Sequence, residues 1–136
     1  MIKYFVMDVD GTLTDGKIYM SSNGELMKAF NIKDGCGIHD ILIPANIIPV
    51  IITGRYSDIV LNRCNELGIN KIFQGISDKL NQIINITSDL SEIAYIGDDL
   101  NDLASMKAIK DCGGVVGCPC DAVDKIIELS DYVSTQ

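Results

Sequence analysis

Two carboxylates stand one residue apart at the end of an apolar run near the start of the chain. Residues 3–14 read Lys-Tyr-Phe-Val-Met-Asp-Val-Asp-Gly-Thr-Leu-Thr, so Asp8 and Asp10 close the run, and a glycine and two hydroxyl residues follow. An apolar run that ends at a glycine turn is typical of a buried strand. A charge at the end of a core strand is costly unless it is paired or bound to a metal. We therefore expect a cationic group beside these two carboxylates.

Polar residues also follow two later apolar runs. One run ends at Thr53 and Gly54, and another ends at Asp98 and Asp99. Lys79 lies at the start of a helix that follows a further short strand. In open α/β sheets, ligands bind outside the carboxyl ends of the strands, near the point where the strand order reverses. If the three strands are neighbours, all these groups converge on one crevice.

These side chains suit phosphoryl transfer. Carboxylate oxygens are hard ligands for Mg²⁺, which takes few carboxylates together with waters and substrate phosphate. A hydroxyl, glycine amides and a lysine around such a metal form a cradle for a phosphoryl group. One carboxylate can attack phosphorus and form an aspartyl-phosphate, while a second protonates the leaving alkoxide and then deprotonates water. The residue types alone do not divide these two roles between Asp8 and Asp10.

Strands and helices alternate along nearly the whole chain. We expect later strands at 49–52, 71–73, 92–96, 114–117 and 132–133, and helices at 38–43, 57–68, 78–86, from 99 onward and at 122–129. This alternation predicts an α/β fold, a three-layer Rossmann-like parallel sheet with helices on both faces. Residues 17–30 are the exception, because two short β-prone runs flank an Asn-Gly turn and predict a β-hairpin flap directly after the first strand.

The composition is that of one soluble domain. The residues are 47% hydrophobic and 22% charged, as in an ordinary globular protein. A length of 136 residues suffices for a single domain over 1–136 and is too short for two domains. The net charge is −8 and no basic stripe is present, so nucleic acid and membrane are not expected as partners. No apolar run approaches the roughly 18 residues of a membrane span. The first residues lack the features of a signal peptide, and we expect a cytoplasmic location.

The cysteines do not indicate a metal site. There are five, an odd number, and free thiols are the expectation in a reducing compartment. Cys112, Cys118 and Cys120 lie close in sequence, but their spacing matches no structural zinc pattern and a fourth ligand is missing.

The motifs, taken in order, resemble those of the haloacid dehalogenase (HAD) superfamily of phosphatases. Asp8-Val9-Asp10-Gly11-Thr12 is similar to motif I, Thr53 to motif II, Lys79 to motif III, and Gly97-Asp98-Asp99 with Asp102 to motif IV. Residues 10–16, 23–25, 28–31, 34–35 and 52–55 resemble the 3-deoxy-D-manno-octulosonate 8-phosphate (KDO 8-phosphate) phosphatase group. That group includes the ketodeoxynononate 9-phosphate phosphatases and the phosphatase-like domain of acylneuraminate cytidylyltransferases.

The resemblance implies a Mg²⁺-dependent phosphomonoesterase that removes the terminal phosphate of an eight- or nine-carbon 2-keto-3-deoxy sugar acid. It makes Asp8 the nucleophile and a Mg²⁺ ligand. Asp10 becomes the general acid/base and gives a backbone carbonyl to the metal, and Asp98 becomes the third protein ligand. Thr53 and the Gly54 amide are then expected to hold the phosphoryl oxygens.

Several of these residues have a structural alternative. Asp99 and Asp102 are also suited to capping the helix that follows them. Lys79, to which the resemblance assigns the offsetting of charge between nucleophile and phosphoryl group, is alternatively a solvated helix residue. Arg55 either pairs with a surface acid or binds a substrate carboxylate bidentately. For the whole chain, the alternative is a non-catalytic, phosphatase-like oligomerisation or regulatory domain associated with sialic acid or KDO activation; a phosphomutase is a third reading.

The spacing of the motifs leaves no room for a cap domain. Asp8 and Thr53 are 45 residues apart, and Thr53 and Lys79 are 26 apart, which the elements of the sheet itself account for. Only the hairpin is left to cover the crevice, and an isolated hairpin is marginally stable in water. We therefore expect hairpins to pack across subunits, in agreement with the homotetramers of the group resembled. The Gly-rich tail usual in that group does not follow Gln136, which leaves the identity of the sugar open.

Overall fold

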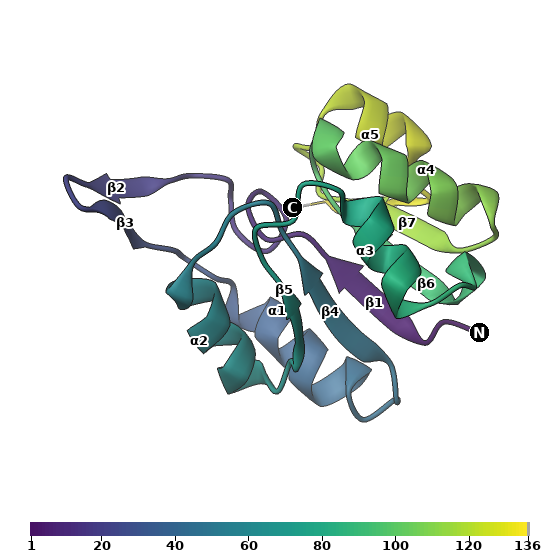
Figure 1. Ribbon diagram of the computed structural model, residues 1–136, viewed down its shortest axis with the longest axis horizontal. Coiled ribbons are helices and arrows are strands. Elements are labelled where there is room, and N and C mark those ends of the chain that lie inside the picture. Colours follow the sequence, from purple (N-terminus) through teal and green to yellow (C-terminus); the bar gives the residue numbers. More distant parts are fainter. Residues whose placement is uncertain (136) are drawn as a thin grey trace.

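The computed structural model describes residues 1–135, and its core is one parallel sheet (Figure 1). The six strands are ordered β5-β4-β1-β6-β7-β8, and every neighbouring pair is parallel. Their bounds are β1 Tyr4–Met7, β4 Ile48–Ile52, β5 Lys71–Phe73, β6 Ile93–Ile96, β7 Val115–Cys118 and β8 Tyr132–Val133. The predicted α/β fold with a parallel sheet is confirmed.

Helices cover both faces of the sheet, because buried apolar side chains lie on both sides of the central strands (Figure 1). One face packs against α3 (Lys79–Ile86), α4 (Leu103–Asp111) and α5 (Asp124–Leu129). The other packs against the π-helix η1 (Gly37–Leu42) and α2 (Asp58–Leu67), and α1 (Ile32–Cys36) lies against α2 through Gly35. Two single 3-10 turns, η2 (Leu90–Glu92) and η3 (Leu100–Asp102), complete the helical set. No helix within residues 1–135 has the length and apolar character that crossing a membrane requires.

The helix ends follow local sequence signals in most places. The Ser57 side chain caps α2, Gly68 ends it in a left-handed conformation, and the Asp78 side chain caps α3. The start predicted for the helix at 38–43 is wrong. The chain turns helical at Ile32, because the Asn31 side chain accepts a hydrogen bond from the Lys33 amide at 2.9 Å and caps the first turn.

A two-stranded antiparallel sheet forms the predicted hairpin. Its strands are β2 (Tyr19–Ser21) and β3 (Gly24–Met27), and it projects away from the main sheet (Figure 1). The chain enters it from the loop after β1 and returns from it to α1. The hairpin is therefore rooted where β1 ends.

The strand order sets the position of the polar residues. β1 lies between β4 and β6, with Met7 paired to Ile51 on one side and to Ile96 on the other. The Asp8 amide extends this register by donating to the Ile96 carbonyl at 3.1 Å. Because β4 continues into Thr53 and β6 into Gly97, the carboxyl ends of three adjacent strands meet at one edge of the sheet.

Candidate active site

A buried lysine holds two buried carboxylates at this edge. Lys79 Nζ donates to Asp8 Oδ1 at 3.0 Å and to Asp102 Oδ1 at 2.8 Å, and the three side chains are at most 7% exposed. Burial by itself lowers the pKa of Lys79, but the two carboxylates outweigh it and raise the pKa above its usual value. Burial, and then the charge of Asp102, raise the pKa of Asp8 despite Lys79. The site therefore carries one cation against several acids.

Asp102 is fully occupied by hydrogen bonds. Its Oδ1 accepts from Lys79 and from the Tyr95 hydroxyl, and its Oδ2 accepts from the backbone amides of Asp98 and Asp99 at 3.1 and 3.3 Å. Asp99 in turn caps η3, and the two acids form a capping box. Asp102 therefore locks the loop after β6 and orients Lys79 at the same time.

Asp98 lies beside Asp8 and contacts the loop that follows β1. Its Oδ1 accepts a hydrogen bond from Thr12 Oγ1 at 3.3 Å. A Cβ on Gly11 would lie 1.9 Å from Asp98 Oδ2, and Gly11 has φ +85°, so only glycine fits this approach. Burial, followed by a hydrogen bond to Asp8 and the Asp8 charge, raises the pKa of Asp98 to about 8.

The carboxylates fit a divalent cation. Asp8, Asp98 and Asp102 each place an oxygen within 4.8 Å of the others. Both oxygens of Asp102 already accept hydrogen bonds, from Lys79, Tyr95 and two backbone amides. We therefore take Asp8 and Asp98 as the pair of carboxylates that could bind a metal ion. Burial first, and then the hydrogen bond to Asp8 and its charge, raise the pKa of Asp98, so a hard cation between the two carboxyl groups would stabilise their charged forms, and their oxygens suit Mg²⁺.

Thr53 and Gly54 follow β4 at the same edge of the sheet. Thr53 is 3% exposed at the carboxyl end of β4, where its amide donates to Phe73 and its carbonyl accepts from Ile76. A Cβ on Gly54 would come within 4.0 Å of the Asn101 side-chain nitrogen. The loop after β4 therefore faces the loop after β6, and the Thr53 hydroxyl and the Gly54 amide lie at the carboxyl edge of the sheet, where Asp8 follows β1.

Asp10 belongs to a second set of charges that reaches into the hairpin. Lys28 Nζ donates to Asp10 Oδ1 at 2.6 Å and to Glu25 Oε2 at 3.0 Å. Arg55 Nη2 lies 3.8 Å from the same Glu25 oxygen. The Asp10 carboxylate is 24% exposed, whereas that of Asp8 is 7% exposed. Of the two motif carboxylates, Asp8 is thus the buried one and Asp10 the more exposed one.

Comparison with known proteins identifies the family. No family model matches the sequence. The 3-deoxy-D-manno-octulosonate 8-phosphate phosphatase KdsC of Salmonella typhi is 42% identical over 137 residues, which cover 98% of this chain and 70% of that protein. The chain belongs to the KDO 8-phosphate phosphatase family of the HAD superfamily.

Solved structures of this family share the fold. The phosphatase from Moraxella catarrhalis, in complex with magnesium, phosphate and KDO, superposes with a TM-score of 0.90 at 42% identity, over 99% of this chain and 77% of that one. The cobalt-bound phosphatase from Haemophilus influenzae superposes with a TM-score of 0.91 at 34% identity, over 99% of this chain and 76% of that one. Both neighbours therefore carry a divalent metal, in agreement with the acidic cluster described above.

The structure brings together Asp8, Lys79, Asp98 and Asp102, as the sequence predicts, but several of their contacts were not predicted. The alternative of a solvated Lys79 is wrong, because the residue is 2% exposed. The capping role of Asp102 is confirmed, but its bond to Lys79 was not foreseen. Tyr95 was not foreseen, and Lys28 entered only through the resemblance over residues 28–31, without a named partner; Tyr95 occupies a core position of β6, and Lys28 follows β3. At neither position does the sequence indicate which acid the side chain will bond to.

Proposed function

We propose that this protein is a Mg²⁺-dependent phosphomonoesterase that removes the terminal phosphate of a 2-keto-3-deoxy sugar acid, either KDO 8-phosphate or a nine-carbon analogue. The carrying observation is the placement of Asp8. This carboxylate is 5% exposed at the end of the central strand, hydrogen-bonded to Lys79 and beside Asp98. A buried acid set between a lysine and a second acid is suited to nucleophilic attack on a phosphoryl group when a metal is bound.

Each residue then has a defined task. An Asp8 oxygen attacks phosphorus, the bond from phosphorus to the sugar oxygen breaks, and the departing alkoxide takes a proton from Asp10. Asp10 next removes a proton from water, the hydroxide attacks the phosphorus, and phosphate leaves with Asp8 restored. Thr53 and the Gly54 amide hold the phosphoryl oxygens, and Lys79 offsets the charge between Asp8 and the phosphoryl group.

Mg²⁺ would be held by the Asp8 and Asp98 side chains and by the Asp10 backbone carbonyl. When bound, it supplies positive charge that draws the anionic phosphoryl group toward Asp8. The fit rests on the carboxylate oxygens of Asp8, Asp98 and Asp102, which lie within 4.8 Å of one another, and on their hard donor character.

The choice of substrate rests on the relatives and on Arg55. The Salmonella relative is named a KDO 8-phosphate phosphatase, and the Moraxella structure holds KDO. Arg55 is 44% exposed beside Glu25, which is linked through Lys28 to Asp10. We propose that it binds the carboxylate of the sugar acid bidentately.

The substrate is tested by steady-state kinetics with Mg²⁺ on KDO 8-phosphate, ketodeoxynononate 9-phosphate and sialic acid 9-phosphate. We expect kcat/KM to be highest for KDO 8-phosphate, by roughly 10-fold or more, since a lost polar contact to a substrate group costs at least that much. EDTA removes activity and added Mg²⁺ restores it. A preference for a nine-carbon substrate overturns the sugar assignment. No turnover of any of the three favours a non-catalytic domain.

We further propose that the chain is one domain without a cap, that the hairpin takes the place of the cap, and that four chains assemble through it. Met20, Leu26 and Met27 on the hairpin are 60%, 65% and 49% exposed, although an isolated hairpin needs packing to be stable. We also propose a cytoplasmic location, because all five cysteines are unpaired and Cys36, Cys112 and Cys120 are exposed.

Light scattering after gel filtration tests the assembly. We expect a tetramer for the wild type and smaller species for Leu26→Glu, since a charge on an apolar contact is costly to bury. Ile84→Glu on α3 is the matched control, because Ile84 is 52% exposed and lies outside the hairpin. A monomeric wild type, or a tetramer that survives Leu26→Glu, contradicts this part of the proposal.

A further inference from the structure

Lys28 is a buried cation that the proposed chemistry leaves without a task. Its side chain is 3% exposed, and both of its partners are carboxylates, Asp10 and Glu25. Burial by itself lowers the pKa of Lys28, but the hydrogen bonds to these acids outweigh it and raise the pKa above its usual value. A charged lysine with so little exposure is kept only where its partners compensate its desolvation. Its position is therefore fixed by Asp10 and Glu25.

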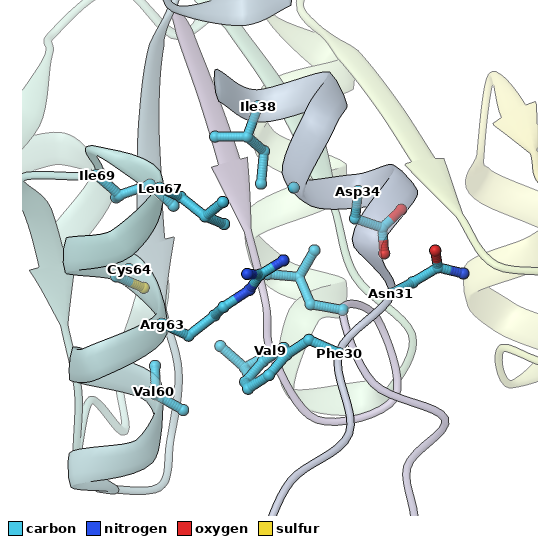
Figure 2. Close-up of a pocket in the computed structure, with 12 residues that line it drawn as sticks. Val9, Phe30, Asn31, Asp34, Ile38, Val60, Arg63, Cys64, Leu67 and Ile69 are labelled. Carbon is cyan, nitrogen blue, oxygen red and sulfur yellow. The ribbon is translucent and has the colours of Figure 1, made fainter. Parts of the chain in front are cut away.

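The chain around Lys28 is anchored so that this side chain points inward. In residues 27–30 exposure alternates: Met27 and Ala29 are exposed, and Lys28 and Phe30 are partly buried. Alternate residues of an extended segment point to the same side. Phe30 packs among the apolar side chains beneath the loop after β1, with the Arg63 guanidinium 5.9 Å from its ring centre (Figure 2). Phe30 thereby anchors the returning strand, and Lys28 is presented two residues earlier.

The contacts of Lys28 tie three segments together. Asp10 belongs to the loop after β1, Glu25 belongs to β3, and Arg55, which shares the Glu25 oxygen, belongs to the loop after β4. Lys28 occupies Oδ1 of Asp10, and within residues 1–135 no other hydrogen bond or ion pair reaches that carboxylate. Oδ2 of Asp10 is thus left for a substrate, while rotation of the carboxyl group is restrained by the hairpin.

From this geometry we propose that Lys28 is a positioning residue for proton transfer: it holds the Asp10 carboxyl group by Oδ1, so that Oδ2 delivers the proton to the leaving alkoxide. The proposal rests on the proposed phosphatase function and deepens it. Lys28 touches neither phosphorus nor the nucleophile in this scheme, and it acts only through Asp10. In this step Asp8 attacks phosphorus, the bond from phosphorus to the sugar oxygen breaks, and the proton passes from Asp10 to that oxygen.

A leaving-group series separates this role from a purely structural one. Aryl phosphates of similar size, from phenyl phosphate to 2,4-dinitrophenyl phosphate, differ in how much their phenolate needs a proton to depart. We compare kcat/KM, because it reports the steps up to departure of the phenol and not the later hydrolysis. For Lys28→Met we expect a loss of roughly 10- to 100-fold with phenyl phosphate, part of what general acid catalysis contributes. With 2,4-dinitrophenyl phosphate we expect almost no loss.

Three further variants make the result decisive. Asp10→Asn removes the acid itself and is expected to show the same dependence on the leaving group, only steeper. Lys28→Arg keeps a donor for Oδ1 and is expected to recover most of the rate. Lys17→Met is the matched control, since Lys17 is 73% exposed in the segment leading into the hairpin and lies beside Asp15 alone. Circular dichroism and thermal melting establish that each variant is folded.

The outcomes distinguish this inference from the function on which it rests. If Lys28→Met loses the same factor with every leaving group, Lys28 acts on binding or on the fold, and the inference is wrong. An unchanged rate with all substrates overturns it equally. If the wild type itself hydrolyses no phosphate ester with Mg²⁺, the proposed function fails first, whatever Lys28 does.

Discussion

The Asp8→Asn variant is expected to lose turnover almost completely while staying folded. The amide keeps the size of the carboxyl group and an oxygen that can accept the 3.0 Å hydrogen bond from Lys79. It cannot serve as the attacking oxyanion, and removing a nucleophile that works with an acid/base partner costs on the order of 10⁴-fold or more in kcat. The measurement is kcat on KDO 8-phosphate with saturating Mg²⁺, together with a thermal melt.

Asp111→Asn provides the comparison for this variant. It makes the same change of carboxyl to amide at an exposed residue at the end of α4, and we expect its kcat to match the wild type. Acid quenching during turnover adds an independent readout, because phosphate bound to Asp8 is expected in the wild type and absent from Asp8→Asn. A variant that keeps most of the phosphatase rate, or that still carries protein-bound phosphate, shows that another group attacks.

The fold was predictable where local sequence signals determine it. Apolar runs that end at polar residues predicted β1, β4 and β6, and the helices expected at 57–68 and 78–86 begin where the side chains of Ser57 and Asp78 cap them. The start of α1 was missed because two glycines, Gly35 and Gly37, argue against a helix there. Gly35 instead lies close to a distant residue: a Cβ at this position would lie 2.5 Å from Arg63 Nη2, so the side chain of a residue 28 positions away would have to shift.

The site residues likewise fall into those that the sequence predicts and those that only the structure shows. Asp8, Asp10 and Asp98 come shortly after strands, and Lys79 begins α3. Their convergence is therefore expected from the parallel sheet. The bond of Tyr95 to Asp102 and that of Lys28 to Asp10 depend instead on which way a side chain points after the fold has formed. In the sequence, Tyr95 is one more core residue of a strand and Lys28 one more charged residue of a hairpin. Only the packed structure shows that each restrains an acid.

Among these variants, Lys79→Met is expected to be the most destabilising. It leaves Asp8 and Asp102 buried without the one cation that bonds to both. Breaking a buried ion pair by removing one partner typically costs roughly 3–5 kcal/mol, because the remaining charge is uncompensated. We expect a clear fall in melting temperature, and phosphatase activity should fall with it, since Lys79 also offsets the charge that builds up next to Asp8. Lys107→Met, at an exposed position of α4, is the control.

The dependence of this instability on pH identifies its cause. Burial and Asp102 already raise the pKa of Asp8 when Lys79 is present, so loss of Lys79 raises it further. A carboxyl group whose pKa is higher in the folded than in the unfolded state favours folding at low pH, and this contribution is lost as the pH rises through the folded pKa. In EDTA, the gap in melting temperature between variant and wild type is therefore expected to narrow as the pH is lowered from 8 toward 5. A gap that stays constant over this range points to lost packing rather than to uncompensated charge.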